Sequence, residues 1–275
     1  MMRLAYNSTI IPTFAAIMGT QRSIVAARGL GLFLLVLTAC EKEIALDYRT
    51  VPPLYVAEVS LTPDKVSARI TTTRSVQETK ATYVDHATVT VYATGEDEYA
   101  DTLEYRGDGV YQLTYWGMTG QEYNVDICID GQHYTSASTL RSAPVMNSFR
   151  FVWKDVLTER MLFGDLRLQD VPNEVNYYFM HLYCNGVGYR WAVLNDRSNP
   201  GEELQQLFSC CTERDMQKGT GSDVLHEGDR LRLEVRSIDR AAYDYLYSLQ
   251  LMDNTGTNPV ANFTNGMLGY FSAYQ

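Results

Sequence analysis

Short segments in which apolar and polar residues alternate fill the first half of the chain, and turn signals separate them. In HATVTVYA, residues 86–93, an apolar residue recurs at every second position, so these residues share one face of a strand. Arg106-Gly107-Asp108-Gly109 and Asp130-Gly131 each separate two such segments, and their glycines can adopt the positive φ that tight hairpins require. About seven short strands within roughly 90 residues predict an antiparallel β-sandwich over residues 54–143.

A second β-rich domain is predicted over residues 144–275, after the boundary segment RSAP. Long polar loops separate its strand-like segments, which are 147–153, 162–169, 175–184, 188–195 and 229–238. One helix is predicted near residues 240–252, because Asp239 can cap it and apolar residues follow at helical spacing. The tail is expected to end in a strand packed on the core. The fold class is therefore mainly β, with one late helix.

The N-terminal segment has the organisation of a lipoprotein signal peptide. Its apolar run, residues 29–39, is too short for a membrane span, which needs roughly 20 residues, but it suits the apolar region of a signal peptide. Leu37-Thr38-Ala39-Cys40 then resembles a bacterial lipobox, in which the cysteine thiol is lipidated and the chain is cut before it. Residues 1–39 are predicted to be the leader and residues 40–53 a tether. The alternative is a buried N-terminal helix that contains Cys40 by chance.

Charge and cysteine usage limit the partners. The leader holds three of the 23 basic residues and no acidic ones, so the mature chain has 20 basic against 33 acidic residues, a net charge of −13. Such a chain repels nucleic acid and anionic membrane surfaces, so lipid must provide the membrane attachment. Four further cysteines remain, and the sequence leaves open whether an exported chain pairs them: Cys128, Cys184, Cys210 and Cys211.

Catalytic motifs are absent from the sequence. It contains no HExxH, GxSxG, GxGxxG or P-loop pattern, and its four histidines stand far apart. No cysteine–histidine spacing indicates zinc. The sequence therefore predicts a non-catalytic protein without a metal or cofactor, although its many carboxylates leave an acid–base pair open.

Aromatic residues give the best indication of binding. They are dense in the second domain, where Tyr189 and Trp191 stand two apart in the segment GYRWAVLN. On a regular strand they would share one face, which is either the core or a binding surface. If this protein captures a ligand, the second domain with its longer loops is expected to do so.

Several motifs, in order, resemble those of the domain-of-unknown-function 4249 family, a family of outer-membrane lipoproteins of Bacteroidota. Besides the lipobox and the strand that soon follows it, these are Asp85-His86-Ala87-Thr88-Val89-Thr90-Val91, Gly109-Val110-Tyr111, Gly120-Gln121-Glu122-Tyr123, RAAYDYLYSL at 240–249 and NFTNGMLGYF at 262–271. The resemblance covers nearly the whole mature chain, but residues 150–230 match poorly. It implies an immunoglobulin-like or transthyretin-like first domain and no known catalytic residues.

The resemblance also implies a location and a role. The expected protein is a lipid-anchored outer-membrane component, often encoded beside a TonB-dependent transporter, that acts as a non-catalytic binding or accessory part of nutrient uptake. Glu41-Lys42-Glu43 loosely resembles the signals that send such lipoproteins to the outer face of the cell. Asp101-Thr102-Leu103 resembles an O-glycosylation acceptor of this phylum, with Thr102 as the modified residue. The alternatives are a structural or adhesive surface component and a hydrolytic enzyme.

Overall fold

The computed structural model describes residues 52–74, 82–172, 174–197, 201–219, 223–255 and 259–275. They belong to one compact unit, Thr50–Gln275. The predicted leader, Cys40 and nearly all of the predicted tether lie outside the described residues. In the part of the chain that is described, no helix is long and apolar enough to cross a membrane.

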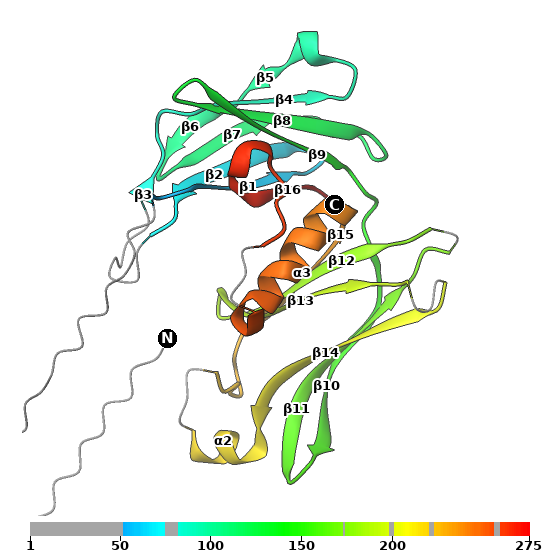
Figure 1. Ribbon diagram of the computed structural model, residues 1–275. Coiled ribbons are helices and arrows are strands. Elements are labelled where there is room, and N and C mark those ends of the chain that lie inside the picture. Colours follow the sequence, from blue (N-terminus) through cyan, green and yellow to red (C-terminus); the bar gives the residue numbers. More distant parts are fainter. Residues whose placement is uncertain (1–51, 75–81, 173, 198–200, 220–222, 256–258) are drawn as a thin grey trace, which may run out of the picture. The chain divides into compact units, whose positions relative to one another are not determined.

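The first region forms two sheets (Figure 1). One has the order β16-β1-β2-β7-β6, with β3 beside β2, and the other has the order β5-β4-β8-β9. The elements are β1 (Tyr55–Leu61), β2 (Lys65–Thr72), β3 (Thr82–Tyr83), β4 (Thr88–Ala93), the 3-10 helix η2 (Asp97–Tyr99), β5 (Asp101–Thr102), β6 (Glu104–Gly107), β7 (Val110–Thr114), β8 (Glu122–Ile129) and β9 (Gln132–Thr139).

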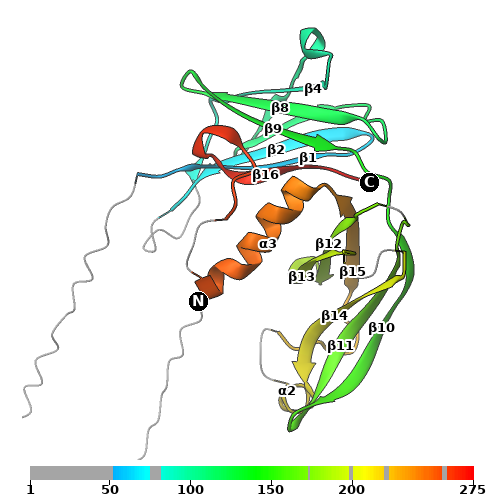
Figure 2. The ribbon, with the colours of Figure 1, turned by 45° about the vertical axis from the view of Figure 1, so that its right-hand side comes forward.

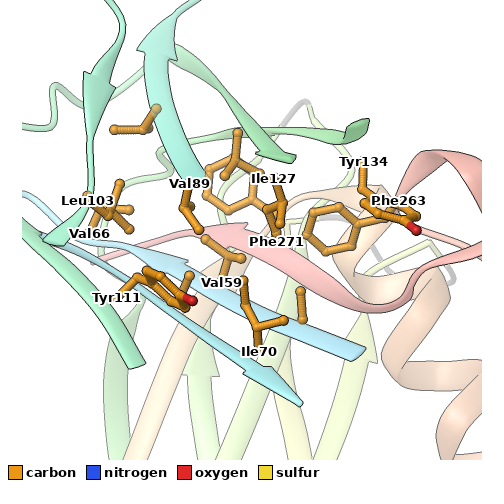
Figure 3. Packing of buried hydrophobic residues seen from close by; sticks show 14 of the residues in the cluster. Val59, Val66, Ile70, Val89, Leu103, Tyr111, Ile127, Tyr134, Phe263 and Phe271 are labelled. Atoms are coloured by element: carbon orange, nitrogen blue, oxygen red, sulfur yellow. The ribbon is translucent and has the colours of Figure 1, made fainter. Parts of the chain in front are cut away.

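Alternating side chains from both sheets form one core, as a sandwich requires (Figure 3). Val59 and Ile70 come from the first sheet and Val89 and Ile127 from the second, and all four are at most 2% exposed. The alternation of apolar and polar residues in the sequence therefore indicates which side of each strand faces the core. The predicted β-sandwich is confirmed.

Both predicted hairpin turns are present. Asp108 and Gly109 have φ of 49° and 72°, and Asp130 and Gly131 have φ of 51° and 79°. The flanking residues pair directly, Gly107 with Val110 and Ile129 with Gln132. Positive φ at both central residues matches the twist of the adjoining strands, which is why aspartate–glycine pairs occur there.

The last strand of the chain returns to the first sheet. β16 (Leu268–Ala273) pairs in parallel with β1, so the division at residue 144 did not anticipate its place. Asn262 Oδ1 accepts hydrogen bonds from Ser136 Oγ (2.7 Å) and from the N–H of Phe271 (2.9 Å), whose ring is fully buried in the sandwich core. The closing motif at residues 262–271 therefore attaches β16 to the sandwich.

The second region contains two three-stranded sheets, here called the β11 sheet (β10-β11-β14) and the β12 sheet (β13-β12-β15) after their central strands. Side chains from both, including Leu166, Tyr178 and Phe208, bury one shared cluster. The elements are β10 (Val145–Val156), β11 (Glu159–Gln169), β12 (Tyr177–Cys184), β13 (Val187–Asn195), β14 (Glu203–Thr212), α2 (Glu213–Lys218), β15 (Leu231–Ile238) and α3 (Arg240–Thr255). The 3-10 helix η3 (Thr264–Gly266) follows and contacts β9 of the first region.

Helix α3 covers the other face of the β12 sheet, and it also contacts β16 (Figure 2). Asp239 caps it as predicted, accepting a hydrogen bond from the N–H of Ala242 (2.8 Å). The same carboxylate accepts a hydrogen bond from Ser138 Oγ of the sandwich, and Ser138 Oγ accepts the N–H of Ala273 (2.8 Å). Burial raises the pKa of Asp239. One cap thus connects α3 to both β9 and β16.

Strand β14 and helix α2 were missed by the sequence prediction. β14 has a less regular pattern, since Leu204, Phe208 and Cys210 face the interior but Gln206 occupies the alternating position between the first two. Helix α2 lies in a segment interpreted as a polar loop. Thr212 caps it by accepting the N–H of Asp215, and Gly219 ends it with φ of 61°. The short capping motif was the available signal for this helix.

Candidate functional site

Tyr189 and Trp191 lie on opposite faces of the β12 sheet, so the prediction that they share a face is wrong. Leu182 pairs with Arg190 and Tyr183 with Gly188, which leaves Tyr189 as the extra residue of a β-bulge. One inserted residue reverses the alternation. Trp191 therefore packs in the cluster beneath α3, whereas Tyr189 packs in a cluster between the two sheets.

Both rings take part in packing and are only partly buried. The Trp191 ring lies 6.2 Å from that of Phe179, and the guanidinium of Arg190 lies 4.2 Å from the centre of the Tyr189 ring. The Tyr189 hydroxyl donates to the carbonyl oxygen of Asp223 (2.8 Å). Replacing both residues with alanine is therefore expected to disturb two clusters and to lower the melting temperature.

Thr102 lies in β5 and is exposed, so its hydroxyl is accessible to the predicted modification. The adjoining Leu103 is buried in the sandwich core, which fixes the position of this edge of the sheet. Cys40, the predicted lipidation site, lies outside the described residues.

The two sheets of the second region close on one side only. On the closed side β13 lies against β14, where Arg190 donates to the carbonyl oxygens of Ser209 (2.8 Å) and Cys210 (3.1 Å). On the other side the edge strands are β10 and β15. Within the described residues, β10 pairs only with β11 and β15 only with β12. We call this the open side, defined by Phe149, Phe151, Trp153, Leu231, Leu233 and Val235.

A cavity of about 510 Å³ lies at the open side. Phe151 of β10 and Leu231 of β15 both line it, and they are 39% and 36% exposed although both belong to inward-facing rows. The other apolar walls come from β11, α2 and the loop before β15, through Leu162, Met216 and Leu225. These side chains remain exposed because, among the described residues, no strand pairs with this edge of the β11 sheet.

The rim of the cavity is acidic and held in place. It consists of His226, Glu227 and Asp229. Asp229 accepts hydrogen bonds from the N–H of His226 (2.7 Å) and from Asn185 Nδ2 (2.8 Å). These two bonds lower the pKa of Asp229, so its carboxylate is ionised at neutral pH. The loop therefore presents a fixed negative charge beside an apolar wall.

The neighbouring thiols do not supply a nucleophile. Cys210 and Cys211 are buried in the cluster behind the cavity, and burial raises the pKa of the Cys210 thiol. The protonated thiol is a poor nucleophile. In the described part of the chain, no group of three or more metal-ligating side chains comes together. The chemistry that the lining residues support directly is apolar contact combined with attraction of a cation.

Most of the later aromatic residues pack the elements together. Tyr245 of α3 stacks on Tyr270 of β16, with ring centres 5.6 Å apart. Arg236 of β15 lies 4.1 Å from the centre of the Tyr274 ring and forms an ion pair with Glu234. Arg236, Tyr270 and Tyr274 also line a polar groove of about 430 Å³ on the first sheet. Since the guanidinium already has partners, the open side is the better candidate for binding.

Comparison with known proteins gives one match. No curated protein matches the chain. The model of the family described as Domain of unknown function (DUF4249) matches residues 41–275, which include both β-rich regions, α3 and the closing motif. The chain therefore belongs to the DUF4249 family.

Proposed function

We propose that this protein is an outer-membrane lipoprotein, facing the cell exterior, that acts as a non-catalytic binding or accessory component of a TonB-dependent nutrient uptake system. Lipid on Cys40 anchors it, and residues 41–53 lead to the first strand. Because the mature chain is acidic, the acyl chains rather than a basic patch provide the attachment.

The observation that carries the binding role is the open side of the second region. Phe151 and Leu231 of this side are exposed, and an exposed apolar patch with a polar rim is typical of an interaction site. The lipobox supports the location, and the family resemblance supports the association with a transporter. Residues 150–230, which supply most of the open side, are also the part that resembles the family motifs least, as expected for a surface that differs with the partner.

Co-purification from native membranes tests this function. The anchored protein is extracted in mild detergent, and the proteins that accompany it are identified by mass spectrometry. We expect a TonB-dependent transporter in the wild-type sample and at least about tenfold less of it with Phe151→Asp or Leu231→Asp, since a charge would be buried in the contact. Trp116→Asp is the matched control, because Trp116 is 84% exposed on a loop of the sandwich.

Equal melting temperatures of the four proteins would show that the substitutions leave the fold intact. Absence of any outer-membrane transporter from the wild-type sample would contradict the uptake role. Equal recovery of the transporter with the wild type and all three variants would contradict the assignment of the open side as the binding surface.

One edge of β10 pairs with no strand in the described part of the chain, which also favours a second candidate, a structural or adhesive component that assembles by strand exchange. This candidate predicts that the purified protein forms concentration-dependent polymers. The uptake role predicts a monomer that associates with a different protein, and light scattering separates the two.

A further inference from the structure

We infer that the open side binds an extended segment of a partner protein, which adds as a strand to the free edge of β10 and places apolar side chains against the cavity and a basic side chain beside Glu227. This inference rests on the proposed binding function and names the kind of partner segment that the same site takes.

The backbone of β10 is the first reason. β10 is the longest strand among the described residues, with 12 residues, and it pairs with β11 along one edge. At about 3.3 Å per residue it extends for about 40 Å. Along its other edge every second residue directs an N–H and a C=O away from β11, and within the described residues no strand pairs with them. A small molecule would satisfy few of these groups, whereas an added strand satisfies the whole row.

The side chains supply the second reason. Phe149, Phe151 and Trp153 follow one another at every second residue on the inward face of β10. A strand added beside them would present its own alternate side chains to the same side, where Leu231 of β15 lines the cavity opposite Phe151. An apolar residue at every second position of the partner would thus cover the open side, as alternate pockets do in strand addition.

A second cavity lies at the opposite ends of the same two strands. It has a volume of about 310 Å³ and is lined by Val145 of β10 and by Ser237 and Ile238 of β15. The first cavity is lined by Phe151 and Leu231 of the same strands. Each end of the facing strands β10 and β15 therefore borders a cavity, while Phe149, Leu233 and Val235 between the two cavities pack against the shared cluster. An extended chain along β10 would contact both cavities.

The charge of the rim determines which charged side chains the partner segment can carry. Glu227 is exposed at the rim and Asp229 is held ionised beside it, in a mature chain with 20 basic and 33 acidic residues. A lysine or arginine in the partner would be attracted here, and a carboxylate would be repelled. The outward face of β10 carries Arg150 and Lys154, which discourage the pairing of two copies of the same edge.

A selection experiment tests the inference on the purified, anchored protein in mild detergent. A display library of 12-residue peptides is the probe. We expect the enriched peptides to have apolar residues at alternate positions and at least one lysine or arginine. Binding should weaken at least about tenfold with Phe151→Asp, and Trp116→Asp should leave it unchanged.

Backbone N-methylation of the best peptide then separates strand addition from side-chain capture. Methylation of the alternate residues whose N–H groups face β10 should abolish binding, because each removes a ladder hydrogen bond. Methylation of the intervening residues, whose N–H groups face away, should leave binding intact. The two peptides have the same side chains and the same number of methyl groups, so they are matched.

Three results would overturn the inference: no enriched peptide, equal binding by both methylated peptides, or a protein that pairs with its own β10 when no peptide is present. No transporter is needed for this measurement. Failure of the peptide test would therefore leave the co-purification result intact, and failure of the co-purification would leave the peptide result intact.

Discussion

Replacement of Gly269 with alanine is expected to prevent β16 from pairing with β1 and to destabilise the protein by more than about 4 kcal/mol. Gly269 has φ of 101°, which side chains rarely adopt. An added Cβ would lie 1.9 Å from the carbonyl oxygen of Ala57 and 2.8 Å from its amide nitrogen. These are backbone atoms of the neighbouring strand, so no side-chain rotation relieves the overlap.

Denaturant unfolding of the purified protein measures this effect. Gly266→Ala is the matched control, because Gly266 also has positive φ, 79°, but open space surrounds the position of its Cβ. Gly266→Ala should lower the free energy of unfolding by about 1–2 kcal/mol, which is the cost of holding an alanine at positive φ without a steric overlap. Equal stability of the two variants would mean that the parallel pairing of β1 with β16 is absent from the folded protein.

Replacement of Cys40 with alanine is expected to abolish membrane attachment. The thiol of Cys40 is the predicted acceptor of the diacylglycerol, and the acidic mature chain offers no electrostatic substitute for the lipid. The variant should accumulate as an unlipidated precursor and leave the outer-membrane fraction. Immunoblots of fractionated cells after a high-salt wash provide the measurement.

Cys128→Ala is the control for this experiment. Cys128 lies in β8 of the sandwich, far from the lipobox in the sequence, so its replacement should leave the protein in the membrane fraction. If the Cys40 variant still sediments with the outer membrane, the interpretation of residues 37–40 as a lipobox is wrong.

Local signals in the sequence predicted the first region well. Aspartate–glycine turns need only two residues with positive φ, and the alternation of the flanking strands already marks the face that packs. Asp239 is a similar case, since a cap acts within one helical turn. The mainly β fold and the late helix were therefore accessible from the sequence.

Features that depend on distant partners were not accessible. The partner of β16 lies about 200 residues earlier in the chain, and no local pattern indicates a parallel pairing of that kind. The bulge at Tyr189 depends on how β13 aligns with β12, so spacing alone placed Tyr189 and Trp191 on one face. The open side is also invisible in the sequence, because Phe151 and Leu231 read as ordinary core positions.

Hydrogen exchange of the β10 amides in native outer membranes tests the central claim most directly. The exchange of residues 149–156 is compared between the protein in its membrane and the purified protein in detergent. Binding of a partner strand predicts slower exchange in the membrane for the amides on the free edge, and Phe151→Asp should remove this protection. Equal exchange in the membrane and in detergent would contradict the claim that the open side is the binding site.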